Sequence, residues 1–306
     1  LRVQTLPGPL LSVAATLPVC PSLVFDPELH MTTYVQKFIK KYQVSDKGAP
    51  TPLERKLSEA LLPGKRFVEG GTGYVRQVLG AIGYAVCVCR PDMAFAQSHL
   101  QRFTEAVTED VMAAVRHYMR YFAGTKDACL TFMEGIPYKL SASADADWRG
   151  RSVTRRSTGG HVVLLGGQII AWKSKMLPGA SSGADPPKMS STEAEFVECG
   201  LCMRSVLFFR NLHRWISGFD SCFSLVPGPI PVEQDNKGSV DTCDGGAGKG
   251  LRHLEHHEFF AREMCESGEF QVVKKDTSEI VSDLLTKPAN SGAMLRHKFG
   301  NFNFRV

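Results

Sequence analysis

Long hydrophobic runs are missing from this sequence of 306 residues. No apolar stretch approaches the roughly 18 residues that a membrane-spanning helix needs, so we expect no membrane partner. The opening "LLSVAATLPVC" has only a faint likeness to the apolar part of a secretory signal. Because the chain starts at Leu1 rather than Met, we do not expect residue 1 to be a natural start. Residues 1–30, which are rich in Pro and Leu, are interpreted as a poorly defined lead-in.

A regular cysteine framework is missing as well, although the chain has nine cysteines. Their odd number and irregular spacing are typical of reduced thiols in an intracellular protein. Cys199 and Cys202 make one CxxC motif, but it has no second pair and lies in a helical-looking run. We therefore favour buried helix thiols over a zinc site there.

Charge of either sign is modest: 22% of the residues are charged and 43% are hydrophobic, as in ordinary globular proteins. The net charge of +5 is compatible with a polyanionic partner without requiring one. The length of the chain predicts two domains.

Residues 31–135 carry helix signals and predict a small, mainly helical domain. In "MTTYVQKFIKKYQV" the apolar residues recur at helical spacing. Thr108 is a good N-cap for the apolar, periodic run that follows it, and Gly124 is a good stop. Pro91 suits the first turn of another helix. This part indicates no chemistry by itself.

Beyond Tyr138 the pattern changes to short strand-like runs separated by glycines. "YKLSASADADW", "TGGHVVLLGG" and "QIIAWKSK" predict two consecutive hairpins. A long amphipathic helix follows, with Ser190 and Glu193 as a capping box. Strand, helix, strand and a last helix over 278–287 complete the pattern. Residues 136–290 thus predict an α/β domain with a mixed five-stranded sheet, and residues 291–306 a tail.

Four carboxylates lie on different predicted elements, and folding of the domain could bring them together. Asp145 lies on the first, central strand, Glu195 one turn into the long helix, Asp235 at the end of the fourth strand and Asp283 in the last helix. If they meet, like charges raise their pKa values, and a pair of Mg²⁺ ions about 4 Å apart would resolve the conflict. Spacing alone leaves a solvated surface as the alternative, because the chain has 31 acidic residues.

The ordered motifs carry a resemblance to a known family. They are "DADWRG", "RRSTGGHVVLLGGQIIAWKSK", "SSTEAEF", "DNKGSV", "RHLEHHEFFARE" and "SDLLTKP". This series resembles the ribonuclease H domain that ends the Pol polyprotein of copia-type retrotransposons. "YVRQVLGAIGYAVCVCRPDMAFAQSHLQRF" resembles the segment between polymerase and nuclease in those polyproteins, and the likeness covers about residues 31–303. It implies a ribonuclease-H-like fold and metal-dependent endonucleolytic cleavage of the RNA in RNA–DNA hybrids during reverse transcription.

Matched residue by residue, the resemblance gives each of the four carboxylates a role. Asp145 would bridge two Mg²⁺ or Mn²⁺ ions, and Glu195 and Asp235 would share one of them. Asp283 would hold the ion that activates the attacking water. The expected products carry a 5′-phosphate and a 3′-hydroxyl.

Other titratable residues near these motifs receive lesser roles. Asp147 shares the strand face of Asp145 further along, so it could support the site without binding metal. Glu193 is better explained by the helix cap. The family has histidines that match His253 and His257, which implies an auxiliary role in product release or proton transfer. Zinc is disfavoured there, because His256 would point away from the other two on a helix.

A basic hairpin favours a nucleic-acid substrate. No acidic residue lies between Asp147 and Asp185, whereas six cations do: Arg149, Arg151, Arg155, Arg156, Lys173 and Lys175. Cations that meet phosphates give salt-dependent binding, and a hybrid would be recognised by shape and 2′-hydroxyls. A merely solvated hairpin is the alternative.

The sequence also departs from the family. No polymerase palm precedes Met31, so we expect no polymerase activity from this chain alone, and an upstream polymerase part of the same polyprotein would be its partner. "GGAGKG" and a long turn after Lys175 are unusual. The alternative function is a catalytically inactive nucleic-acid-binding remnant. An integrase-type transferase is a third alternative. We disfavour it, because it would use a three-carboxylate pattern and usually an upstream zinc-binding region, and neither appears in the sequence. We expect an intracellular location, in cytoplasmic virus-like particles or the nucleus.

Overall fold

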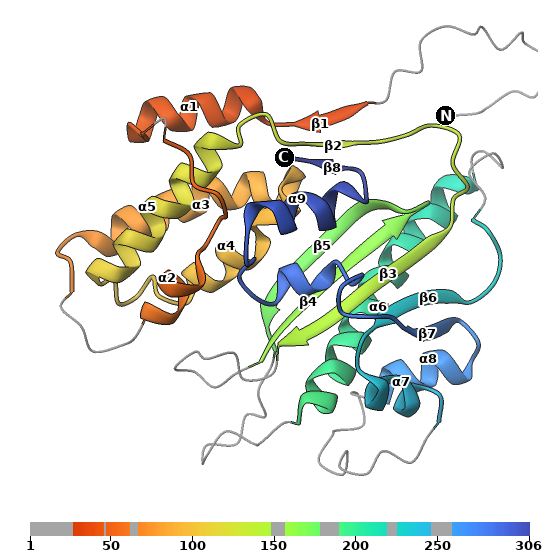
Figure 1. Ribbon diagram of the computed structural model, residues 1–306. Coiled ribbons are helices and arrows are strands. Elements are labelled where there is room, and N and C mark those ends of the chain that lie inside the picture. Colours follow the sequence, from red (N-terminus) through yellow and green to blue (C-terminus); the bar gives the residue numbers. More distant parts are fainter. Residues whose placement is uncertain are drawn as a thin grey trace, which may run out of the picture.

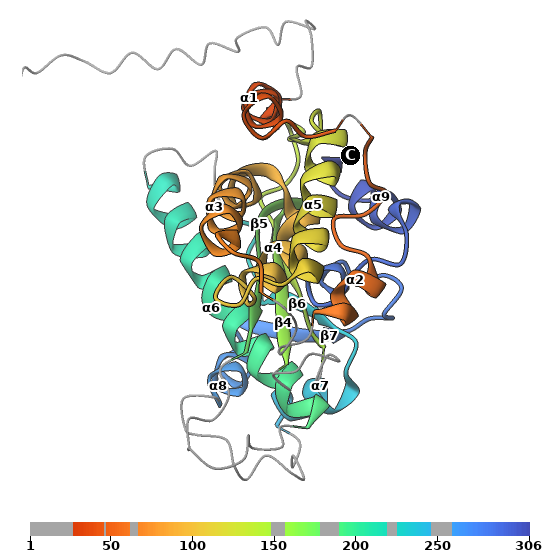
Figure 2. The ribbon, with the colours of Figure 1, turned by 90° about the vertical axis from the view of Figure 1, so that its left-hand side faces the viewer.

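The computed structural model describes residues 27–45, 47–61, 67–147, 157–177, 190–218, 225–245 and 259–306. It contains a five-stranded sheet with the long helix α6 along it and a group of helices beside it (Figure 1). The view turned by 90° places α6 and α9 on opposite sides of β4 and β5 (Figure 2). No helix in these ranges is long and apolar enough to cross a membrane.

The central sheet has the order β5-β4-β3-β6-β7. Its strands are β3 (Leu140–Asp147), β4 (Thr158–Leu165), β5 (Gln168–Met176), β6 (Ile230–Gln234) and β7 (Phe270–Lys274). β3, β4 and β5 form the two predicted antiparallel hairpins, whereas β6 runs parallel to both β3 and β7. The prediction of a mixed five-stranded sheet is confirmed.

Helix α6 (Ser191–Ser217) packs across β3 and β4. The predicted capping box begins it, since the Ser190 hydroxyl accepts from the Glu193 amide and the Glu193 carboxylate accepts from the Ser190 amide. The buried alanines of β3, Ala142 and Ala144, share a core with Phe196 of the helix. Such small side chains leave room for a helix to approach the sheet closely.

Two short helices share the α6 core. They are α7 (Lys237–Cys243), which the sequence did not predict, and α8 (Phe260–Glu266). The Asn236 side chain caps α7 by accepting from the Ser239 amide at 3.1 Å. Gly268, with φ of +72°, follows α8, and the residues directly before Phe259 lie outside the described ranges.

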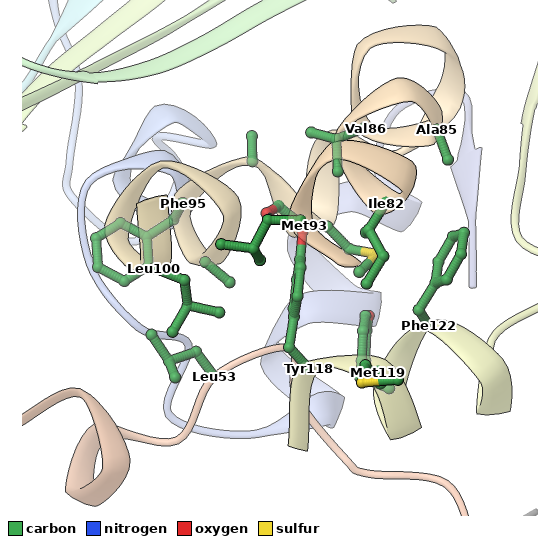
Figure 3. Close-up of a cluster of buried hydrophobic side chains, with 14 of the residues drawn as sticks. Leu53, Ile82, Ala85, Val86, Met93, Phe95, Leu100, Tyr118, Met119 and Phe122 are labelled. Carbon is green, nitrogen blue, oxygen red and sulfur yellow. Dashed lines mark hydrogen bonds between the residues drawn. The ribbon is translucent and has the colours of Figure 1, made fainter. Parts of the chain in front are cut away.

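The helical segment supplies most of a second core. Its helices are α1 (Thr32–Tyr42), α2 (Arg55–Ala60), α3 (Gly71–Cys89), α4 (Ala94–Gln101) and α5 (Glu109–Gly124), with the 3₁₀ turn η1 (Pro91–Met93). Tyr118, Phe122 and Ile82 are among the side chains that interlock between α3, α4 and α5 (Figure 3). Thr108 caps α5 as predicted, accepting from the Val111 amide.

This second core continues into the end of the chain. It includes Leu285 of η4 (Ser282–Leu285), Phe299 of α9 (Gly292–Gly300) and Phe304 of β8 (Phe304–Arg305). β8 also completes a small sheet with β1 (Glu28–His30) and β2 (Cys129–Thr131). The segment interpreted as a tail therefore packs against the helical segment.

The helix predicted over residues 278–287 is wrong, because the structure has only the 3₁₀ turn η4 there. Polar side chains of this segment form hydrogen bonds that compete with a helix. The Ser282 hydroxyl lies 2.8 Å from the Ser143 hydroxyl of β3, and the Thr286 hydroxyl donates to the Asp283 carbonyl at 3.1 Å. Pro288 disfavours a helical conformation in the residue before it. These contacts hold η4 against β3 and β4.

Candidate metal centre

Three carboxylates from three different elements meet at one edge of the sheet. Asp145 belongs to β3, Glu195 to the first turns of α6, and Asp235 directly follows β6. One carboxylate oxygen of each lies within 4.8 Å of one oxygen of the other two. Asp145 and Glu195 are each only 5% exposed, and Asp235 is half-buried.

Strand pairing explains how Asp145 and Asp235 come to the same level. Ser143 of β3 is paired with Glu233 of β6, and the two strands run parallel. Two residues further along, each strand therefore delivers its aspartate to the same edge of the sheet.

A fully buried glutamine anchors Glu195 to the strand that precedes Asp235. Gln234 donates from Nε2 to the Glu195 carbonyl at 2.9 Å and accepts from the Ser239 hydroxyl at 2.8 Å. The Thr277 hydroxyl donates to Asp235 Oδ2 at 2.7 Å. Sequence reasoning missed both Gln234 and Thr277. For Gln234, the only signal was a polar residue at an inward position of β6.

The electrostatics of this group favour a cation. Burial raises the pKa of Glu195 to about 9, and the negative charges of Asp145 and Asp235 add to that rise. Burial also raises the pKa of Asp145 to about 6; a hydrogen bond from Thr286 opposes this rise, and the charge of Asp283 reinforces it. Within the described residues, Glu195 Oε2 is buried without a hydrogen-bond partner. A divalent ion would satisfy this oxygen and keep all three groups ionised.

The chemistry of the donors narrows the kind of ion. Three carboxylates form an all-oxygen set, which suits hard cations such as Mg²⁺, Mn²⁺ or Ca²⁺ rather than metals that prefer thiolate. Asp145, Glu195 and Asp235 could therefore hold a divalent metal.

Asp283, the fourth predicted carboxylate, lies outside this group of three. It is 2% exposed and forms ion pairs with Lys287 and, at 3.4 Å, with Lys298. The Lys298 ammonium also donates to the carbonyls of Thr277 and Ile280. Sequence reasoning missed both lysines. The i,i+4 spacing of Asp283 and Lys287 was an available signal, but nothing local points to Lys298.

The other residues singled out in the sequence have diverse positions. Asp147, at the end of β3, is half-buried, and burial raises its pKa. Lys173 and Lys175 of β5 line a cavity of about 380 Å³ together with Glu198 of α6, on the α6 side of the sheet. The remaining predicted binding or auxiliary residues, Arg149, Arg151, Arg155, Arg156, His253 and His257, lie outside the described residues.

Comparison with known proteins shows extended similarity to transposon polyproteins. The retrovirus-related Pol polyprotein from transposon RE1 of Arabidopsis thaliana is 29% identical over 265 residues, which is 86% of this chain. That from transposon RE2 of the same plant is 30% identical over 76% of the chain. That from transposon TNT 1-94 of Nicotiana tabacum is 26% identical over 89% of the chain. No family model matches the sequence.

The chain belongs to the Pol polyproteins of copia-type retrotransposons. It spans 17%, 15% and 20% of the length of these three relatives. The resemblance to these polyproteins that the sequence motifs indicated is therefore confirmed. The three carboxylates that could hold a metal lie within this segment of a Pol polyprotein.

Proposed function

We propose that this Pol segment is a ribonuclease H that cleaves the RNA strand of RNA–DNA hybrids during reverse transcription, with Mg²⁺ or Mn²⁺ as cofactor. The observation that carries the proposal is the meeting of Asp145, Glu195 and Asp235 at one edge of a sheet ordered β5-β4-β3-β6-β7. This strand order is the one that the resemblance to ribonuclease H implies. In this proposal the fold is ribonuclease-H-like.

The chain's own residues would prepare the site for a phosphodiester. Asp145, Glu195 and Asp235 hold the ion, and burial limits the water that competes for it. A divalent ion bound there supplies Lewis-acid polarisation of a phosphoryl oxygen and a more acidic water. The Thr286 hydroxyl donates to Asp145 Oδ2 and so opposes the rise that burial causes in the pKa of Asp145, and the Thr277 hydroxyl donates to Asp235 Oδ2 and orients that carboxylate. In this assignment Asp283 would act beside the group of three, as the resemblance implies.

Basic residues would bind the hybrid through its phosphates. Arg102, at the end of α4, donates to the Thr158 hydroxyl at 3.0 Å and thus reaches the base of the β3–β4 hairpin. The predicted cations of this hairpin would bind further phosphates, and Lys173 and Lys175 would do so on the α6 side of the sheet. The upstream polymerase part of a Pol polyprotein would deliver the hybrid, with the helical segment between the two.

The decisive experiment uses the purified chain, a labelled RNA–DNA hybrid, and Mg²⁺ or Mn²⁺. We expect cleavage of the RNA strand, and a loss on the order of 100-fold or more in Asp145→Asn, because a ligand of the activating ion is removed. Asp241→Asn is the matched control, since Asp241 is exposed on α7.

The second candidate function is a binding remnant without catalysis. The observation that favours it is the engagement of Asp283 by two lysines, which competes with metal binding at that carboxylate. In the same assay, salt-sensitive hybrid binding without cleavage under either ion would support the remnant and overturn the nuclease.

A further inference from the structure

The four carboxylates expected to hold metal fall into two electrostatic environments. Asp145, Glu195 and Asp235 face one another, and within the described residues no lysine or arginine forms an ion pair with any of them. Asp283 has two ammonium partners instead, Lys287 and Lys298.

Lys287 occupies a special position next to this group. It follows Thr286, whose hydroxyl donates to Asp145, so the backbone here is fixed against β3. Its ammonium pairs with Asp283 and also lowers the pKa values of Asp145 and Asp147 by its positive charge. The ammonium therefore lies where its charge acts on Asp283 and Asp145 together, which is the place that the resemblance assigns to a second metal ion.

Lys298 fixes the other side of Asp283. This lysine is 7% exposed, and two backbone carbonyls accept from its ammonium in addition to Asp283. Its amino group is therefore held in place beside Asp283. Lys287, whose side chain is 39% exposed, is the partner that a small substitution could remove without disturbing the core.

A charge count distinguishes one ion from two. The four carboxylates carry four negative charges when ionised, and Lys287 and Lys298 supply two positive ones. One divalent ion then makes the group neutral, whereas a second would leave two uncompensated positive charges in a poorly solvated place. Burial raises the pKa of Asp147, and the positive charges of Lys287 and, to a lesser degree, Arg55 oppose that rise. Asp147 and Arg55 together add one charge of each sign, so they leave the count unchanged.

We propose that the centre binds a single divalent ion, held by Asp145, Glu195 and Asp235, and that the Lys287 ammonium takes the place of a second ion beside Asp283. This inference deepens the proposed function and rests on it for its catalytic meaning. The ion count itself is a property of the protein alone, so it can be measured without cleavage. In the reaction, Lys287 would be a positioning residue that holds Asp283 and balances charge.

The test is a titration of the full chain with Mn²⁺, read by calorimetry and by electron paramagnetic resonance. We expect one ion per wild-type chain, both alone and with an all-DNA duplex, and a spectrum of isolated Mn²⁺. Lys287→Met should bind two ions and show the spin coupling of a close pair. Lys287→Arg, which retains the charge, should return to one ion.

Lys275→Met is the matched control. Lys275 is also 39% exposed at its side chain, and it pairs at 2.7 Å with Glu233, two residues before Asp235, rather than with Asp283. Its loss should leave the count at one. Circular dichroism and thermal melting of all variants verify that each is folded.

The outcomes separate this inference from the proposed function. Two coupled ions in the wild type, or one ion in a folded Lys287→Met, would overturn the role of Lys287 even if hybrid is cleaved. One ion in the wild type with two in Lys287→Met would support it even if no hybrid is cleaved. No binding of Mn²⁺ by any variant would overturn both the inference and the metal-dependent nuclease.

Discussion

The Thr286 hydroxyl donates a hydrogen bond to Asp145 Oδ2, and so joins the turn after η4 to the central strand of the sheet. The two residues are far apart in the chain, and Asp283 and Lys287 flank the contact on the same turn. The ionisation of Asp145 therefore depends on how the end of the chain packs.

Replacing Thr286 by Val should weaken divalent-ion binding in a pH-dependent way. The hydrogen bond lowers the pKa of Asp145, which burial has raised to about 6, so its loss raises that pKa further. At pH 6 a larger fraction of Asp145 is then protonated, and we expect the Mn²⁺ affinity to fall about tenfold. At pH 8 the decrease should be smaller, because the carboxyl is ionised in both proteins. Thr286→Ser retains the donor, so a loss as large as that of Val would contradict this explanation.

The metal-free protein should become less stable as the pH rises from about 5 to 9. The pKa of Glu195 is about 9 in the folded state against an ordinary value of 4.5, so between these values the folded state binds more protons than the unfolded state. The free energy of unfolding therefore decreases with rising pH in that window. Glu195→Gln should remove the part of this dependence that lies above about pH 6, the pKa of Asp145, and, at pH 8 without metal, stabilise the fold by about 1 kcal/mol or more.

Denaturant unfolding at several pH values, with and without Mg²⁺, measures this effect. Mg²⁺ should stabilise the wild type at pH 8, because it binds the ionised carboxylates of the folded state, and should stabilise Glu195→Gln much less. A wild-type stability that rises across the whole window in the absence of metal would refute the assignment.

Replacing Gly160 by Ala should disturb the centre from a distance. Gly160 is the β4 partner of Asp145, and a Cβ there would lie 2.6 Å from Leu285 Cβ and 3.1 Å from Thr286 Cγ2. The extra methyl would push the turn away from the sheet, at a cost of about 1–3 kcal/mol in the free energy of unfolding. The same displacement should weaken the Thr286–Asp145 contact and lower the Mn²⁺ affinity.

Gly73→Ala is the control for that substitution. Gly73 lies in helix α3, and a Cβ there would meet nothing within 4 Å. Alanine is favoured over glycine inside a helix, so this variant should gain about 0.5–1 kcal/mol and bind Mn²⁺ as the wild type does. Unchanged ion binding in a folded Gly160→Ala would show that the turn does not position Asp145.

Much of the site's scaffold follows from local patterns. The Ser190–Glu193 cap fixes where α6 begins, and the cap places Glu195 in the first turns of the helix. Period-2 alternation and glycine turns fix β3, β4 and β5, and the short run before Asp235 fixes β6. These patterns can be recognised in the sequence because each depends only on residues that are close together in the chain. The expected meeting of Asp145, Glu195 and Asp235 agrees with the structure, although the catalytic roles remain predictions.

The environment of the fourth carboxylate, in contrast, depends on packing between distant parts of the chain. The lysine that holds Asp283 from the far side, Lys298, lies in a helix that the sequence analysis took for a tail, and Ser143 bonds Ser282 across the fold. The small sheet likewise joins strands from both ends of the chain. Such contacts depend on packing between distant segments, and no local propensity encodes them. Local sequence patterns thus identify the elements that carry the acidic residues, whereas packing brings three of these residues face to face and pairs the fourth with lysines.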